Sequence, residues 1–146
     1  MAFNRRAQAL WTGDLQSGGG KISFTSGALP EVPYSVATRF GDQPGTNPEE
    51  LLAASHSACF SMALTAFLNR QNIQPKSIDT QAVVTIDQAD GGFKITRSRL
   101  RVTGNVPGIT QEQFADFANQ AEKQCPISNA LRNNIEIVVE PELMSS

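Results

Sequence analysis

The chain has 146 residues, a length that favours one domain and can bury roughly 70% of its unfolded surface. Its apolar fraction of 40% and charged fraction of 18% are ordinary for a soluble globular domain. A net charge of −2 gives no electrostatic footprint for nucleic acid or an anionic membrane. We therefore expect a single domain over residues 1–146, with no nucleic-acid partner and no membrane partner.

Residues 7–11 and 21–26 are predicted to be short strands, joined by a turn that contains the glycine triplet at 18–20. Residues 35–39 are predicted to form a third strand. No lysine-serine pair or helix start follows the glycines, so a flexible turn is favoured over a phosphate loop.

A long helix is predicted from Pro48 to about Arg70. Asn47 is a suitable N-cap, proline is favoured at the first helical position, and Glu50 completes a capping box. The apolar residues are not confined to one stripe, which predicts a fully buried central helix. Residues 51–69 contain no Asp, Glu, Lys or Arg and are long enough to span a bilayer. Polar residues interrupt them, and no secretory signal is evident, so we expect a soluble, cytoplasmic protein.

The second half of the chain begins with a predicted hairpin, whose strands cover residues 79–87 and 93–103. The phase of the apolar residues flips within the second strand, which indicates a bulge near Arg97. Thr110 and Gln113 form a capping box for a second helix. The apolar stripe of that helix consists of Phe114, Phe117, Ala118 and Ala121, and is continued by Cys125. Pro126 is expected to begin a short helical turn that reaches Arg132, and residues 135–140 to form the last strand.

This order of elements predicts an α+β fold in which an antiparallel sheet covers a central helix. One sheet and one short helix cannot cover that helix on every side. We therefore expect a second subunit to supply the remainder, in a homodimer.

The two cysteines, Cys59 and Cys125, are either small buried apolar side chains or a reactive pair, because a structural disulfide is rare in a reducing compartment. Cys125 before Pro126 is placed as a helix N-cap, a position that lowers a thiol pKa. Cys59 lies in mid-helix, where burial raises the pKa of a thiol and makes it inert unless a cation lies beside it.

Arg39 is the candidate cation, and Glu49 is its candidate orienting group. Both residues also fit an ordinary surface charge and a favourable first-turn acid. Glu49 and Cys59 are ten residues apart, about 15 Å along a helix, so they cannot meet directly on one helix. An arginine must bridge them, or Glu49 must come from another subunit, which places the expected site at the dimer interface.

His56 lies one helical turn before Cys59, and with Cys125 it could be considered a metal set. H-x-x-C on a helix supplies only two ligands, and the chain has no other histidine. A core or interface histidine is therefore favoured, and no metal is expected.

Several blocks of the sequence resemble one known family over almost the whole chain. They are WTGDLQSGGG at 11–20, SGAL at 26–29, TRFG at 38–41, GTNPEELLAASHSACFSMAL at 45–64, SIDTQAVVTID at 77–87, VPGIT at 106–110 and QCPIS at 124–128. This pattern resembles the osmotically inducible protein C (OsmC) family, whose relatives are the organic hydroperoxide resistance proteins.

The resemblance implies a single OsmC-like domain, an intertwined α+β homodimer with sites at the interface, and a cysteine-based peroxidase without a cofactor. In such proteins the cysteine of SACF, here Cys59, attacks the peroxide and becomes a sulfenic acid. The cysteine of the CP motif, here Cys125, then forms a disulfide with it. The acid after NP, here Glu49, orients an arginine, which in the OsmC branch lies in the TRF segment, here Arg39.

The implied partners are an organic hydroperoxide and a thiol reductant, which is of the dihydrolipoyl type in the hydroperoxide resistance branch. The resemblance also implies a role in oxidative or osmotic stress defence. The apolar residues Leu52, Phe60, Met62 and Phe67 are expected to wall the site and to favour alkyl hydroperoxides over hydrogen peroxide. Two alternatives stay open: a protein that sequesters an apolar ligand and has inert cysteines, and a purely structural stress-associated dimer.

Overall fold

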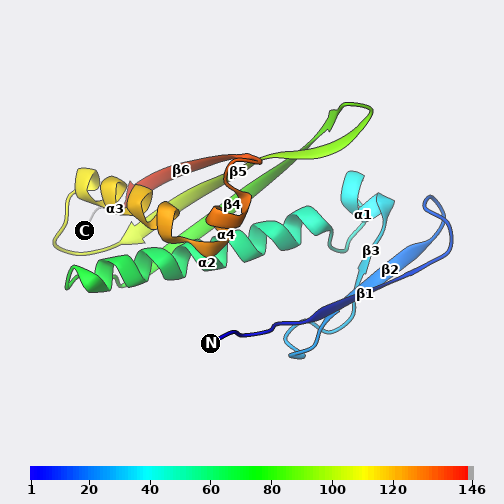
Figure 1. The fold of residues 1–146 in the computed structure, drawn as a ribbon, viewed down its shortest axis with the longest axis horizontal. Helices are drawn as coiled ribbons and strands as arrows, with labels where there is room; N and C mark the ends of the chain where they lie inside the picture. Colours follow the sequence, from blue (N-terminus) through cyan, green and yellow to red (C-terminus); the bar gives the residue numbers. More distant parts are fainter. Residues whose placement is uncertain (145–146) are drawn as a thin grey trace. The chain divides into compact units, whose positions relative to one another are not determined.

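The computed structural model describes residues 1–144 and has a mixed α+β architecture (Figure 1). The chain divides into two compact units, one formed by Met1–Leu51 and the other from Leu52 onward. Each unit is described here by itself. The prediction of a single domain stays a prediction.

The first unit contains a three-stranded antiparallel sheet in the order β1-β2-β3. Its strands are β1 (Ala7–Thr12), β2 (Gly19–Phe24) and β3 (Val32–Tyr34). Residues 13–18 form the turn between β1 and β2, with Thr12 paired with Gly19 at its base. The predicted glycine turn is only partly right, because Gly19 and Gly20 are the first residues of β2.

The prediction of a strand over residues 35–39 is wrong, because this segment forms the short helix α1 (Val36–Phe40). Ser35 is its N-cap and accepts a hydrogen bond from the Thr38 backbone N–H. Thr38 Oγ1 in turn accepts from the Ser35 backbone N–H, at 2.7 Å. This reciprocal capping box outweighs the β-branched residues that suggested a strand.

The long helix α2 (Pro48–Arg70) has the predicted bounds. Asn47 caps it, since its Oδ1 accepts from the Glu50 backbone N–H at 2.8 Å. The Glu50 carboxylate accepts from the Thr46 hydroxyl. Proline at the first helical position costs no hydrogen bond, because the N–H groups of the first turn have no partner within a helix.

The second unit contains a sheet in the order β4-β5-β6, formed by β4 (Ser77–Ala89), β5 (Gly92–Asn105) and β6 (Glu136–Leu143). Strands β4 and β5 form the predicted antiparallel hairpin. Their register shifts between Thr85 and Ile86, which pair with Arg97 and Ile95, so the bulge lies beside Arg97 as expected.

The prediction of a wholly antiparallel sheet is wrong, since β6 pairs with β5 in parallel. Parallel neighbours need a long crossover connection. Here the helices α3 (Gln111–Gln124) and α4 (Pro126–Leu131) provide it. The Thr110 and Gln113 capping box of α3 is present as predicted.

The alternation of side chains along β5 defines the two faces of this sheet. Ser98, Leu100 and Val102 are completely or almost completely buried. Arg97 and Arg99 point the other way and form exposed ion pairs with Glu136 and Glu140 on β6. The buried face of β5 therefore belongs to the core, and the arginine face is solvated.

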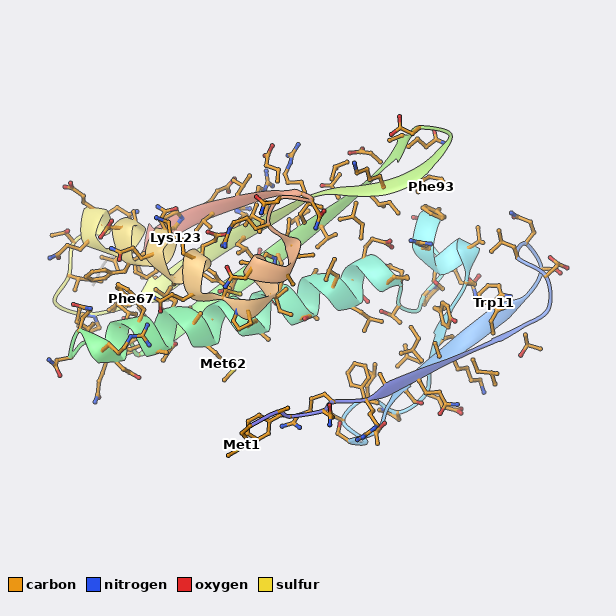
Figure 2. The ribbon with its side chains drawn as sticks, in the orientation of Figure 1. Met1, Trp11, Met62, Phe67, Phe93 and Lys123 are labelled. Atoms are coloured by element: carbon orange, nitrogen blue, oxygen red, sulfur yellow. The ribbon has the colours of Figure 1, made fainter. Side chains whose placement is uncertain are left out.

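The core of the second unit combines α2, β5 and α3. Phe60, Leu64 and Leu68 of α2 have no exposed surface, and neither does Phe114 of α3. Phe67 of α2 packs against the Phe117 ring of α3, with ring centroids 5.5 Å apart (Figure 2). Helix α2 is long and apolar enough to cross a membrane by length and composition alone. Its place in this core identifies it instead as a core helix.

Helix α2 is not buried on every side within one chain. Ala54, Ala58, Met62 and Ala66 recur at four-residue intervals and are exposed. Met62 retains 75% of its possible exposed surface and points away from the sheet (Figure 2). The expectation of a fully buried helix therefore fails for the single chain, which leaves an apolar stripe of three alanines and one methionine, Ala54-Ala58-Met62-Ala66, uncovered.

We predict that Gly104→Ala destabilises the protein. A Cβ at Gly104 on β5 would lie 2.4 Å from the Phe114 ring, and overpacking of this kind costs about 1–3 kcal/mol. The free energy of unfolding from urea titration measures the effect. Gly92→Ala on the same strand is the matched control, because a Cβ there meets no atom within 4 Å. Equal stability of the two variants would contradict this packing.

Candidate functional site

The first pair of predicted site residues, Arg39 and Glu49, lies in the first unit. The Arg39 guanidinium donates from Nε to Glu49 Oε2 at 3.0 Å and from Nη2 to Oε1 at 2.6 Å. This two-point geometry fixes the plane of the guanidinium as well as its position. The Glu49 side chain is 9% exposed, whereas the Arg39 side chain is 36% exposed. The arginine is therefore held from one side, and part of it is open to another group.

The ion pair shifts the pKa of each group in the direction that keeps both groups charged. The hydrogen bond from Arg39 lowers the pKa of Glu49, and the same bond raises the pKa of Arg39. Burial of each group opposes these shifts.

Local structure holds both members of the pair. Arg39 lies in the last turn of α1, where the Phe40 ring packs 5.2 Å from its guanidinium carbon. Thr38 Oγ1 donates to the Thr46 carbonyl at 2.7 Å, which ties α1 to the segment just before α2. Glu49 follows in the first turn of α2. The loop between the two helices is thus pinned at both ends.

The second pair, Cys59 and Cys125, lies in the second unit. Both thiols are free; Cys59 is half-buried and Cys125 is completely buried. Cys59 packs against the core cluster that contains Cys125, and Cys125 lies near enough to raise the pKa of Cys59. The structure thus brings together the two cysteines that the sequence places 66 positions apart.

Burial raises the pKa of the Cys59 thiol, and the neighbouring Cys125 raises it further. A hydrogen bond from the Ile127 backbone N–H works in the opposite direction. Within one chain the balance favours the neutral thiol. Because the thiolate is the nucleophile, Cys59 needs an added cation to react rapidly at neutral pH.

Helix α4 positions backbone donors at both sulfurs. Cys125 is its N-cap, as predicted, and its Sγ accepts from the Ser128 backbone N–H at 3.5 Å. Pro126 occupies the first helical position. The N–H of Ile127, one residue later, is the group that bonds to Cys59. The Ser128 amide therefore holds the Cys125 sulfur, and the adjacent Ile127 amide favours the charged form of Cys59.

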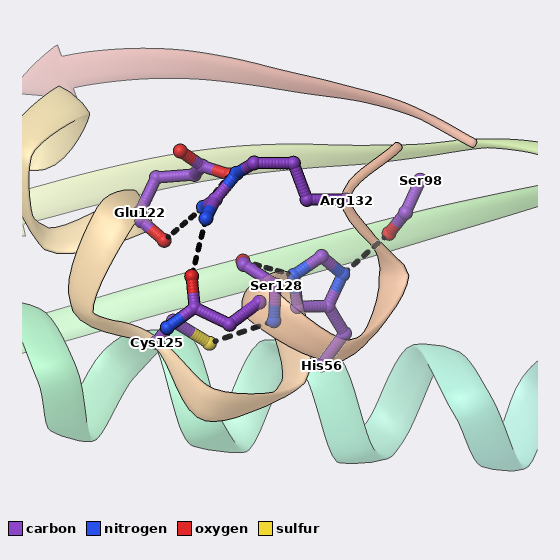
Figure 3. Close-up of polar contacts among 7 residues, drawn as sticks. His56, Ser98, Glu122, Cys125, Ser128 and Arg132 are labelled. Carbon is purple, nitrogen blue, oxygen red and sulfur yellow. Dashed lines mark hydrogen bonds and ion pairs between the residues drawn. The ribbon is translucent and has the colours of Figure 1, made fainter. Parts of the chain in front are cut away.

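His56 is the buried core histidine that the sequence predicted. Its Nδ1 lies 2.6 Å from Ser98 Oγ on β5, and its Nε2 lies 2.7 Å from Ser128 Oγ on α4 (Figure 3). Both ring nitrogens are therefore occupied by hydroxyl groups, which argues against a metal ligand. Within residues 1–144, no group of three or more His, Cys, Asp or Glu side chains is placed to hold a metal ion.

Sequence reasoning missed Ser98 and Ser128 as partners of His56. Ser128 carries a weak signal, since it stands three residues after the N-cap Cys125. Nothing in the sequence singles out Ser98. The expected apolar walls are also partly wrong: Phe60 and Phe67 are buried in the core, which leaves only Leu52 and Met62 with accessible surface.

We predict that the neutral state of His56 makes stability depend on pH. Burial lowers the pKa of His56 below its ordinary value of 6.5, while Glu122, which is paired with Arg132, weakly opposes this shift. Below about pH 6.5 the unfolded chain binds a proton that the folded chain does not. Stability is therefore lost as the pH falls from about 6.5 toward the folded pKa, by up to about 1.4 kcal/mol per pH unit.

Urea titrations from about pH 7 to about pH 5 on the parent chain and on His56→Gln measure this contribution. The difference between the two stability curves should shrink as the pH falls. Parallel curves would contradict a buried neutral histidine.

Comparison with known proteins identifies the family of this chain. Residues 41–140 match the family model described as OsmC-like protein. The chain is 43% identical over 137 residues to the peroxiredoxin OsmC of Escherichia coli (strain K12), which covers 94% of this chain and 96% of that protein. It is 35% identical over 137 residues to the organic hydroperoxide resistance protein OhrB of Bacillus subtilis (strain 168), covering 90% and 98% respectively.

Solved structures agree with this assignment. An organic hydroperoxide resistance protein from Elizabethkingia anophelis, crystallised with thiocyanate, superimposes with a TM-score of 0.79 at 31% identity, covering 99% of this chain and 100% of that one. The crystal structure of OhrB of Bacillus subtilis superimposes with a TM-score of 0.71 at 32% identity, covering 94% and 98%. The chain belongs to the OsmC-like protein family.

Proposed function

We propose that this protein is a thiol-dependent peroxidase that reduces organic hydroperoxides to alcohols and, less efficiently, hydrogen peroxide to water, and serves in the defence against oxidative or osmotic stress. The observation that carries the proposal is the contact between two free thiols, Cys59 and Cys125, at the start of α4. The names of the relatives, a peroxiredoxin and an organic hydroperoxide resistance protein, support the same chemistry. A cytoplasmic location, as for other thiols that must be kept reduced, is part of the proposal.

The first step is attack of the Cys59 thiolate on the terminal oxygen of the hydroperoxide. The sulfur is oxidised, the O–O bond breaks, and the alkoxide leaves and takes a proton to become the alcohol. Cys59 is left as a sulfenic acid. The protein's part is to supply the thiolate and to align it with the O–O bond.

The second step is attack of Cys125 on the Cys59 sulfenic acid. A disulfide forms, and the hydroxyl leaves with the Cys125 proton as water. An external dithiol then reduces the disulfide by exchange through a mixed disulfide. A reductant of the dihydrolipoyl type fits this scheme. The existing contact between the two thiols supports the step, because the resolving sulfur is already adjacent.

We assign the role of thiolate partner to Arg39, oriented by Glu49. Burial raises the pKa of Cys59, so a cation has to favour the charged form. The two-point bond to Glu49 leaves part of the guanidinium open. A partly buried arginine remains charged at any physiological pH.

We further propose that the working form is a homodimer with its sites at the interface. The exposed Ala54-Ala58-Met62-Ala66 stripe lies on the helix that carries Cys59, and Ala58 directly precedes that cysteine. Small side chains along such a stripe permit close packing by a second helix. Light scattering at micromolar concentration should therefore give the mass of a dimer.

Mass spectrometry after a brief, stoichiometric dose of cumene hydroperoxide tests the peroxidase. The reduced protein should lose two hydrogens, and the loss should map to a link between Cys59 and Cys125. Cys59→Ser should show no oxidation at the remaining cysteine. Cys125→Ser should stop at a Cys59 sulfenic acid that dimedone traps.

One observation favours an alternative. The raised pKa of Cys59 also suits an inert cysteine in a protein that sequesters an apolar ligand. In that case the mass after peroxide is unchanged and both thiols remain free.

A further inference from the structure

His56 links the helix of Cys59 to the helix of Cys125, and the two reaction steps leave it without a role. It lies on α2, one turn before Cys59. Its ring is hydrogen-bonded on one edge to Ser98 of β5 and on the other to Ser128 of α4 (Figure 3). All three side chains are completely buried. The imidazole ring, carried by α2, is thus held in place and links α2 to both the sheet and α4.

Helix α4 depends on such contacts. It has six residues, and an isolated helix of that length is not stable in water. At its far end, Arg132 donates to the Glu122 carboxylate at 2.6 Å and to the Glu122 carbonyl at 2.9 Å, which anchors it to α3. Near its start, the Ser128 hydroxyl anchors it through His56, beside the Ile127 side chain, which packs against the core.

Ser128 connects this anchor directly to the resolving sulfur. Its hydroxyl bonds to His56 Nε2 at 2.7 Å, while its backbone N–H donates to Cys125 Sγ at 3.5 Å. Displacement of Ser128 would therefore displace the amide that holds the Cys125 sulfur. It would also disturb the neighbouring Ile127 amide, which lowers the pKa of Cys59.

We propose that His56 is a positioning residue for disulfide formation: by clamping Ser128, it holds Cys125 at attacking distance from the Cys59 sulfenic acid. This inference rests on the proposed peroxidase function and adds a residue to it. Its consequence is kinetic. The sulfenic acid has two fates, attack by Cys125 to form the disulfide, or attack on a second hydroperoxide to give the sulfinic acid and a second alcohol. The clamp favours the first fate.

Ser128→Ala and Ser98→Ala each remove one bond of the clamp and keep every reacting atom. The test measures the fraction of Cys59 that becomes sulfinic acid as the cumene hydroperoxide concentration rises. This fraction gives the rate of disulfide formation relative to overoxidation. We expect Ser128→Ala to slow disulfide formation by on the order of 10-fold, since a displacement of about 1 Å can cost up to about 100-fold. Ser98→Ala should slow it less, because α4 keeps its bond to the ring.

Ser61→Ala is the matched control. Ser61 also lies on α2 and donates to Thr80 of β4 at 2.8 Å, but it has no bond to α4. It should lower the thermal stability without changing the sulfinic acid fraction. An equal change in Ser61→Ala and Ser128→Ala would reduce His56 to a general structural role and overturn the proposal.

Measurements on the parent chain distinguish a failure of the His56 proposal from a failure of the proposed peroxidase function. If the parent chain forms no disulfide with peroxide, the peroxidase proposal fails. If the parent chain forms it and both clamp variants show the parent's sulfinic acid fraction, only the clamp is overturned. Should Ser128→Ala not fold, Ser98→Ala alone carries the test, and a parent-like fraction there overturns the clamp.

Discussion

The proposed chemistry depends on two thiols that meet where α4 begins, Cys125 completely buried and Cys59 half-buried. Burial raises the pKa of Cys59 and so suppresses the nucleophile. A thiol with a pKa of about 8.5 is only a few per cent ionised at pH 7, and burial reduces that fraction further. Any reactivity must come from groups that favour the thiolate, so the charged residues matter as much as the cysteines.

The structure shows one such group at Cys59, and we propose a second. The Ile127 amide acts on Cys59 directly, as a neutral donor. The Arg39–Glu49 pair is a charged group held in a fixed orientation, with part of the arginine open. A carboxylate that orients a guanidinium reduces the entropy lost when the arginine binds a second partner, so the pair is prepared for an anion. A sulfur anion is the partner that the proposed mechanism requires.

Helix boundaries and caps followed from the sequence because they depend on local chemistry. Asn47 and Pro48 at α2, Thr110 and Gln113 at α3, and Cys125 at α4 all occupy their predicted positions. The bulge beside Arg97 followed from the flip in apolar phase.

Other features depend on partners distant in sequence and were not predictable. The parallel pairing of β6 with β5 depends on where the crossover helices return the chain. The bond between His56 and Ser98 joins residues that are 42 positions apart and have no motif in common. Helix α1 was missed although its Ser35–Thr38 capping box is a local signal. The roles of Cys59, Cys125, Arg39 and Glu49 came from the family resemblance and stay predictions.

The most direct test of the account is the titration of the Cys59 thiolate by its ultraviolet absorbance in a Cys125→Ser background, with Arg39 intact and as Arg39→Gln. The account predicts an apparent pKa well below the free-cysteine value of about 8.5 when Arg39 is present. In Arg39→Gln, burial opposed only by the Ile127 amide should move the pKa of Cys59 above that value. A pKa that is the same with and without Arg39 would contradict the claim that this ion pair activates the buried cysteine.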